Sequence, residues 1–321
     1  MKVDRRRFCA GAALLAAGRA ARADELSIPV IDTHVHLFDA TRPQGAPYGG
    51  PADYVSHVAK PADYRARAVP LGIVGAIAVE ASPWSEDNLW LLETAATDPI
   101  IVGVIGNLKP EAPDFAATLD RYRKIPLFRG IRYGNLWGYD IAGQAASPDF
   151  IAGLKHLADQ GLVLDTANPR IELLEALIRV HDRLPDLSIV IDHLPALDPA
   201  PDIQARYDAV LSEMRGRSSI VVKLSEIYHR RNGQVVRDPV AMRARLDQLM
   251  DVFGEDRVLF GSDWPNSVGT ATLEEIVGFV KSYFATKPRR VAEKYFWMNS
   301  ARIYQWARRD AGQPDPAGAH P

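Results

Sequence analysis

Eight short runs of apolar, often β-branched residues recur along the chain, and longer stretches with a helical period separate them. Such runs suit strands that are buried on both faces, as parallel strands are when helices cover the sheet. The alternation of strand and helix therefore predicts an α/β fold with a parallel sheet. The runs are 28–36, 73–81, 100–108, 128–133, 162–166, 188–193, 220–225 and 258–263.

Eight strand and helix units are typical of a closed (β/α)8 TIM barrel, and a length of 321 residues suits one such domain. No Gly/Ser-rich linker divides the chain, so we expect a single barrel domain over residues 24–310. An open doubly wound sheet is the structural alternative. The segment 311–321 is rich in Pro, Gly and Ala and is expected to be a disordered tail.

Several of the helices between the runs have recognisable ends. Three are expected to begin with a capping residue followed by proline, which has a preset φ and no N–H to leave unpaired. These pairs are Ser147-Pro148, Asn168-Pro169 and Asp238-Pro239. Gly161 and Gly254 are expected to end two helices. Thr272 with Glu275 forms a capping box, which predicts one more helix start.

Residues 1–23 differ from the rest of the chain. The segment 4–8 reads DRRRF and resembles the twin-arginine export motif, 11–18 is apolar, and 21–23 reads as an Ala-Arg-Ala cleavage site. The apolar stretch is shorter than the about 20 residues that a spanning helix needs, which weighs against a membrane anchor or an ordinary basic helix. We expect a signal peptide, a periplasmic mature protein that begins near Asp24, and no membrane span in it.

Composition narrows the classes of function. The formal net charge of −2 argues against a nucleic-acid partner, which normally requires a basic excess, and leaves a small-molecule substrate open. The single cysteine, Cys9, lies in the export segment, so the mature chain would hold neither a disulfide nor a catalytic thiol. The sequence has no nucleotide-binding glycine motif and no serine-hydrolase elbow. A homo-oligomer is left open.

The first run ends in IDTHVH at 31–36, which places two histidines two residues apart. Side chains at this spacing share one face of a strand, so His34 and His36 are expected to project together into the barrel. Two imidazoles on one face suit a metal ion. The alternative is a pair of polar histidines that are satisfied by the backbone.

Reactive side chains also close two other runs. His193 ends the sixth run after Asp192, and Asp263 ends the eighth within the segment GSDWP. Barrel enzymes collect their reactive groups at the C-terminal ends of the strands. A buried histidine or aspartate without a partner is costly, so three such placements favour one shared site over separate packing roles.

These motifs together resemble the amidohydrolase superfamily, in its amidohydrolase-2 branch. The shared features are H-x-H on strand one, histidine after strand six and G-S-D-W-P after strand eight. FRGIR at 128–132, VKLS at 222–225 and NSA at 299–301 also look like that branch. Within it, the sequence is most similar to the sugar-lactone and dicarboxylate-lactone hydrolases, and the similarity covers nearly all of the mature chain.

The resemblance implies one divalent ion, zinc or manganese, held by His34, His36 and Asp263. His193 would be a further ligand or would polarise the substrate carbonyl. Such ions accept imidazole and carboxylate ligands and lower the pKa of a bound water. Asp263 would act as general base toward that water and then as general acid toward the leaving alkoxide.

Two departures from the family pattern bear on the site. Strand five ends in Asp165 and has no histidine, so the site is mononuclear at most, and some lactonases of this branch work without a metal. Asp165 could fill the strand-five role or begin a helix. Glu226 follows Ser225 where relatives usually have glycine, which could alter the pocket.

Five residues are candidates for substrate contacts, each with a structural alternative. Arg132 and Lys223 could bind a carboxylate or a ring oxygen, or could form structural ion pairs. Glu80 could hydrogen-bond sugar hydroxyls, and Trp84 and Trp264 could form apolar walls or serve only in packing. The segment 229–231, His-Arg-Arg, is expected to be a solvated loop. No chemistry is expected from the following histidines: His57, His156, His181 and His320.

Lactone hydrolysis is the function that these observations favour. A metal-dependent decarboxylase of the same branch is the second interpretation, and amide or ester hydrolysis is the third. A non-enzymatic periplasmic binding protein is the fourth, although a binding protein has no need for histidines and an aspartate at three strand ends.

Overall fold

The computed structural model describes residues 28–52, 54, 56–194 and 202–319. Eight parallel strands form one sheet in the order in which they occur along the chain. Each lies within one of the eight predicted runs, which confirms the predicted barrel strands. They are β1 (Val30–His36), β4 (Ile73–Val79), β5 (Ile101–Gly106), β6 (Phe128–Arg132), β7 (Val163–Asp165), β8 (Ile189–Ile191), β9 (Ile220–Leu224) and β12 (Val258–Phe260).

The sheet closes between its first and last strands. A parallel bridge joins Val35 to Trp264, just beyond the end of β12. Around it the backbone N–H of Asp263 donates to His34 O at 2.9 Å, and that of His36 donates to Trp264 O at 2.8 Å. The chain therefore forms a (β/α)8 barrel, and the open doubly wound alternative is wrong.

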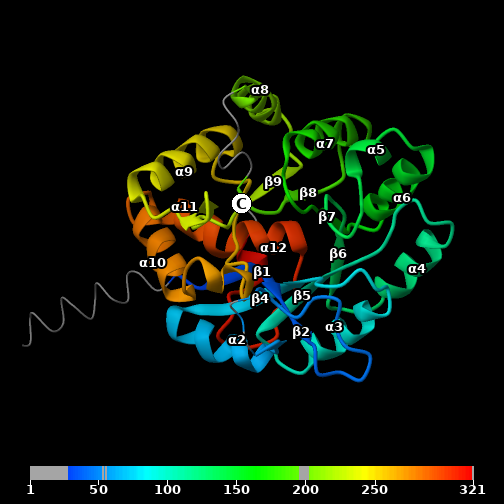
Figure 1. Cartoon of the computed structure of the whole chain (residues 1–321), viewed down its shortest axis with the longest axis horizontal. Coiled ribbons are helices and arrows are strands. Elements are labelled where there is room, and N and C mark those ends of the chain that lie inside the picture. Colours follow the sequence, from blue (N-terminus) through cyan, green and yellow to red (C-terminus); the bar gives the residue numbers. More distant parts are fainter. Residues whose placement is uncertain (1–27, 53, 55, 195–201, 320–321) are drawn as a thin grey trace, which may run out of the picture.

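Helices surround the strands, as Figure 1 shows. The α-helices are α2 (Pro61–Ala68), α3 (Asp87–Ala96), α4 (Phe115–Tyr122), α5 (Ile141–Gln144), α6 (Pro148–Asp159), α7 (Ile171–Arg183), α8 (Gln204–Met214), α9 (Pro239–Phe253), α10 (Leu273–Phe284), α11 (Arg289–Glu293) and α12 (Asn299–Tyr304). Two small hairpins stand apart from the barrel: β2 (Phe38–Asp39) with β3 (Val58–Ala59), and β10 (Arg230–Arg231) with β11 (Gln234–Val235). In the part of the chain described here, no helix combines the length and apolar character needed to cross a bilayer.

The apolar core has two layers. The inner layer fills the barrel, where Ile31, Val163 and Leu259 pack in one cluster with Tyr304 and Trp306 from the C-terminal region. The outer layer packs the other faces of the strands against the helices. Burial on both faces explains why the strands appear in the sequence as continuous apolar runs.

The C-terminal segment is anchored to the barrel. The side-chain amide of Gln313 donates to Val74 O at 3.0 Å and to Pro99 O at 2.8 Å. Gln313 is buried, and Pro316–Ala319 forms a short 3-10 helix. Residues 311–319 therefore differ from the disordered tail expected for 311–321. The export segment 1–23, with Cys9, and His320 lie outside the described residues.

Most of the expected helix ends are present. Asp238 accepts hydrogen bonds from Val240 N and Ala241 N at the start of α9, and Thr272 forms the capping box of α10. The expectation for Asn168 is wrong, because α7 begins at Ile171. Asn168 has φ +54° and its side-chain amide donates instead to Asn135 O at 2.7 Å.

Gly130 on β6 shows how closely the barrel strands approach. A Cβ at this position would lie 2.2 Å from Val163 O on β7. We expect Gly130→Ala to lower the free energy of unfolding by about 1–3 kcal/mol, because the two backbones would have to separate. The control is Gly278→Ala on the exposed face of α10, where a Cβ meets no atom within 4 Å and alanine should be neutral or stabilising. Chemical denaturation of both variants checks this, and equal stabilities would contradict it.

Candidate active site

An irregularity in β1 brings its two histidines to the inside of the barrel. Ile31 belongs to the inner core and Val35 to the outer core, although residues four apart on a regular strand point to the same side. The side of β1 that faces the barrel interior therefore changes between them. The pairing of β1 with β4 shifts register at the same place, and the carboxylate of Asp32 accepts a hydrogen bond from His34 N at 3.1 Å. His34 Nε2 and His36 Nε2 lie 3.1 Å apart, which confirms the prediction that they share a face.

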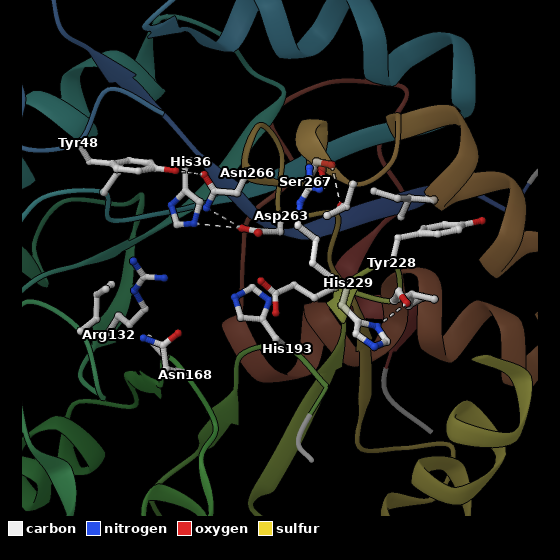
Figure 2. A pocket seen from close by; sticks show the side chains of 18 of the residues that line it. His36, Tyr48, Arg132, Asn168, His193, Tyr228, His229, Asp263, Asn266 and Ser267 are labelled. Atoms are coloured by element: carbon white, nitrogen blue, oxygen red, sulfur yellow. Dashed lines mark hydrogen bonds and ion pairs between the residues drawn. The ribbon is translucent and has the colours of Figure 1, made fainter. Parts of the chain in front are cut away.

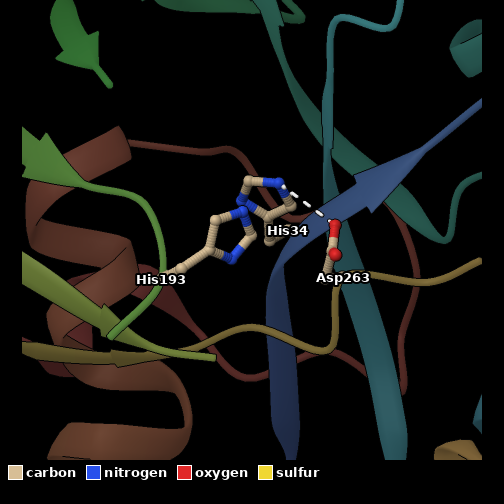
Figure 3. A group of neighbouring side chains, drawn as sticks. All are labelled: His34, His193 and Asp263. Atoms are coloured by element: carbon tan, nitrogen blue, oxygen red, sulfur yellow. Dashed lines mark ion pairs between the residues drawn. The ribbon is translucent and has the colours of Figure 1, made fainter. Parts of the chain in front are cut away.

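Asp263 and His193 lie beside these histidines. Both occupy loops beyond strand ends, with left-handed φ values of +58° for Asp263 and +69° for His193. Single ligand atoms of His34, His193 and Asp263 lie within 4.8 Å of one another. Figure 3 shows the rings of His34 and His193 side by side, with the Asp263 carboxylate facing His34. The structure thus brings together the side chains expected from strands one, six and eight.

Hydrogen bonds determine which atoms of this cluster can accept a cation. His36 Nδ1 lies 3.0 Å from Val79 O, and a carbonyl only accepts, so Nδ1 carries a proton and Nε2 is left to share a proton with Asp263 or to bind a cation. Burial lowers the pKa of His34 well below its ordinary value, although Asp192 opposes this, and the ring is therefore neutral. Burial would raise the pKa of Asp263, but His36 and the neighbouring imidazoles outweigh it and lower this pKa to about 2.

The donor set fits a divalent ion. Asp263 Oδ1 lies 3.3 Å from His36 Nε2 and 3.5 Å from His34 Nε2. Atoms this close to one another are held together by a shared proton or by a cation that lies among them. Imidazole nitrogen and carboxylate oxygen are ligands that zinc and manganese accept, with His193 available as a further donor.

Lys223 lies beneath the histidines and does not reach the pocket. Its Nζ is 2.6 Å from Asp165 Oδ2, 2.8 Å from Asp192 Oδ1 and 3.2 Å from His34 Nδ1. The lysine and both aspartates are completely buried. The expectation that Lys223 contacts substrate is therefore wrong, and the alternative of a structural ion pair is correct.

Asp165 belongs to the same buried group. It accepts hydrogen bonds from Lys223 and from the Tyr304 hydroxyl. Burial raises the pKa of Asp165 to about 7, with Lys223 opposing and Asp192 adding to the rise. Neither role left open for Asp165, a strand-five ligand or the start of a helix, matches this position, because its carboxylate faces the lysine and α7 begins later.

A pocket of about 580 Å³ opens at the C-terminal ends of the strands (Figure 2). Four of the predicted site residues line it: His36, Arg132, His193 and Asp263. Its volume lies in the range that holds a small-molecule ligand. The guanidinium of Arg132 is oriented by Glu80, since Nε donates to Glu80 Oε1 at 2.7 Å and a terminal nitrogen donates to Glu80 O at 2.8 Å.

Three other candidates for substrate contact lie outside this pocket. Glu80 sits behind Arg132, where its carboxylate also accepts a hydrogen bond from Trp137 Nε1 at 3.0 Å. Trp264 is buried and its ring packs against Tyr64, because successive side chains at the strand end point to opposite sides and Asp263 occupies the pocket side. Trp84 is 41% exposed and does not line the pocket. The structure does not place these three side chains in the pocket, which Trp137 lines instead.

Loop residues complete the pocket, and the sequence analysis did not identify them. The Tyr48 hydroxyl donates to Asn266 Oδ1 at 2.5 Å, and Asn266 Nδ2 donates to Asp263 Oδ1 at 3.1 Å. Figure 2 shows Tyr48, Asn266 and Asp263 in sequence along one side, with Asn168 near Arg132. Loops carry no periodic pattern, so the only available signal was the nearness of Asn266 to Asp263 in the chain.

The hairpin of β10 and β11 also reaches the pocket. His229 and Arg230 line it, and Arg230 and Arg231 are exposed, as expected for a solvated loop. The guanidinium of Arg230 donates to Gly233 O at 3.2 Å and to Gly269 O at 2.5 Å, which ties the hairpin to the segment after Asp263. The sequence could not indicate this, because the contact joins distant segments.

Glu226 lines the pocket as well, with φ +54°. Burial raises the pKa of this carboxyl, and the nearby His193 opposes the rise. Among the described residues, eight non-glycine residues have positive φ, and five of them line this one pocket. They are Trp137, Asn168, His193, Glu226 and Asp263. Such concentration of strained backbone is typical of functional sites.

Comparison with known proteins agrees with the fold and the cluster. The sequence profile of a family described as amidohydrolase matches residues 31–306. The L-fucono-1,5-lactonase of Burkholderia multivorans is 28% identical over 254 residues, which cover 76% of this chain and 82% of the relative.

Two solved structures share the architecture. An amidohydrolase from Burkholderia multivorans with bound zinc superposes with a TM-score of 0.75 at 25% identity, covering 87% of this chain and 100% of that one. The 5-carboxyvanillate decarboxylase of Novosphingobium aromaticivorans, complexed with manganese, has a TM-score of 0.63 at 16% identity and covers 88% and 97%. The second likeness concerns the fold alone.

Proposed function

This chain belongs to the amidohydrolase family, and from that premise we propose that it is a lactonase that opens a small sugar lactone. The observation that carries the proposal is the Asp263 carboxylate, which is held among three imidazoles at the edge of the pocket. The lactonase relative supports the choice of substrate class. Pocket groups such as Tyr48, Asn168 and Asn266 are suited to hydrogen-bonding sugar hydroxyls.

Asp263 moves the proton in the proposed reaction. Its low pKa keeps it ionised at neutral pH, so it can take a proton from the water that attacks the lactone carbonyl. The bond between the carbonyl carbon and the ring oxygen then breaks. Asp263 returns the proton to that oxygen, and the product is a hydroxy acid. The hydrogen bond from Asn266 Nδ2 holds the carboxylate in place for both transfers.

His193 and Arg132 line the same pocket as Asp263. The Ser225 hydroxyl lies 3.0 Å from His193 Nδ1 and fixes the ring, which leaves the other nitrogen for the substrate carbonyl or a cation. Arg132, oriented by Glu80, can hydrogen-bond a ring hydroxyl. When bound by His34, His36, His193 and Asp263, a zinc or manganese ion supplies Lewis acidity to the water and the carbonyl.

Metal analysis and a lactone panel test the proposal. We expect the purified protein to hold about one equivalent of zinc or manganese and to acidify weakly buffered solutions of aldonolactones. Removal of the ion by a chelator should lower kcat/KM by at least about tenfold, and its return should restore the rate.

Other outcomes would point to the other interpretations. Release of carbon dioxide from an aromatic carboxylate without lactone opening would indicate a decarboxylase. Retention of a ligand without turnover would indicate a binding protein. Full activity in the demonstrably metal-free protein would remove the ion from the proposal and leave the lactonase assignment in place.

A further inference from the structure

Glu226 places an additional carboxylate in the pocket. It follows Ser225 directly after β9, and the Ser225 hydroxyl contacts His193. Its side chain lines the same pocket as His193 and Asp263. Burial raises the pKa of its carboxyl, the nearby His193 opposes the rise, and Asp263 adds to it.

The backbone conformation of Glu226 indicates that its side chain has a functional role. With φ +54°, the residue lies in the left-handed region, where glycine is unstrained and a residue with a Cβ carries a cost of about 1 kcal/mol. A purely structural turn at this point would be more stable with glycine. The free-energy cost of this conformation is therefore offset by the interactions of the carboxylate in the pocket.

The two arginines that line the pocket are hydrogen-bonded to other groups of the protein. The guanidinium of Arg132 is bound to the carboxylate and carbonyl of Glu80, and Arg230 donates to two backbone carbonyls. The negative charges of Asp263 and Glu226 face the pocket directly. Tyr48, Trp137, Asn168 and Asn266, which also line it, are uncharged side chains.

We propose that Glu226 is a specificity residue that selects neutral polyhydroxy lactones and excludes lactones that bear a free carboxylate. The inference rests on the proposed lactonase function and narrows its substrate class. Glu226 accepts a hydrogen bond from a hydroxyl of the neutral substrate. A carboxylate in the same position would lie beside a like charge and would lose binding free energy.

The test compares two substrates in three proteins. The values of kcat/KM are measured for an aldonolactone and for an aldaric acid monolactone, which carries a free carboxylate, with the wild type, Glu226→Gln and Glu226→Gly. We expect both variants to shift the ratio of the two values by about tenfold or more toward the charged lactone, because the repulsion is removed. Glu213→Gln on the exposed face of α8 is the matched control and should leave the ratio as it is.

A binding measurement separates this inference from the proposed function. The dissociation constants of a neutral sugar lactam and of its carboxylate-bearing counterpart, neither of which is hydrolysed, are measured by calorimetry on the same proteins. A ratio that stays the same in Glu226→Gln, in turnover or in binding, overturns the role of Glu226 even when lactones are hydrolysed. If no lactone reacts but the lactam ratio shifts as expected, the lactonase assignment fails and the charge selection stands.

Discussion

The Asp263→Asn variant is expected to lose about 10³-fold or more of its kcat/KM toward the lactone substrate. The amide has nearly the same shape as the carboxylate and can still contact Asn266, but it cannot take a proton from water or return one to the ring oxygen. It also removes the negative charge that faces the imidazoles of His34 and His36. Steady-state kinetics in the metal-reconstituted protein would measure the loss.

Two controls distinguish a loss of catalysis from a loss of folding. Circular dichroism and thermal unfolding should show a folded variant, because the backbone hydrogen bond from Asp263 N to His34 O does not depend on the side chain. Asp159→Asn on the exposed end of α6 makes the same chemical change away from the pocket and should have near wild-type kinetics. An Asp263→Asn variant with near wild-type turnover would rule out the proton transfers assigned to this residue.

Lys223→Met is expected to lower the free energy of unfolding by about 3–5 kcal/mol. Methionine has a similar length and fills the same space, so the loss comes from charge and not from a cavity. Without the ammonium, the completely buried carboxylates of Asp165 and Asp192 would have no compensating charge at 2.6 and 2.8 Å. Urea or guanidinium denaturation at pH 8 would measure the change.

The pH dependence of this loss of unfolding free energy provides a second test of the role of Lys223. In the variant, the pKa of Asp165 rises further above its unfolded value, and Asp192 loses the main charge that lowers its pKa against the effect of burial. The folded variant therefore takes up more protons than the folded wild type as the pH falls. The deficit should therefore shrink between pH 8 and pH 5. Adding Asp165→Asn should recover part of it, while the exposed Lys155→Met should cost less than about 0.5 kcal/mol. A deficit below about 1 kcal/mol at pH 8 would show that the ion pairs contribute little.

The barrel could be predicted because its strands are buried on both faces. Burial of that kind leaves continuous apolar runs, and the position of each run also located the strand ends where His193 and Asp263 lie. The spacing of His34 and His36 identified the pair correctly, although the irregularity that turns them inward left no mark in the sequence that could be read.

The predictions that the structure does not support concern the direction in which a side chain points and the contacts between residues far apart in the sequence. Local sequence patterns encode neither. Lys223 lies on β9, and its ion pairs inside the barrel depend on Asp165 at the end of β7 and on Asp192 just after β8, which are distant in the sequence. Trp264 and Trp84 were assigned to the pocket by their nearness in sequence to strand ends. Trp264 points the other way, and Trp84 lies on an exposed loop.

The barrel seam has a consequence for how the protein is made and broken down. Asp32 and Ser262 are hydrogen-bonded across it although they are 230 residues apart, and the ligand cluster spans the same junction. During synthesis the binding site cannot exist until nearly the whole chain has left the ribosome. In the folded protein, an ion or inhibitor that binds residues from both β1 and the segment after β12 would link the first barrel strand to the last. Such a ligand should stabilise the folded state and so protect the protein against proteolysis.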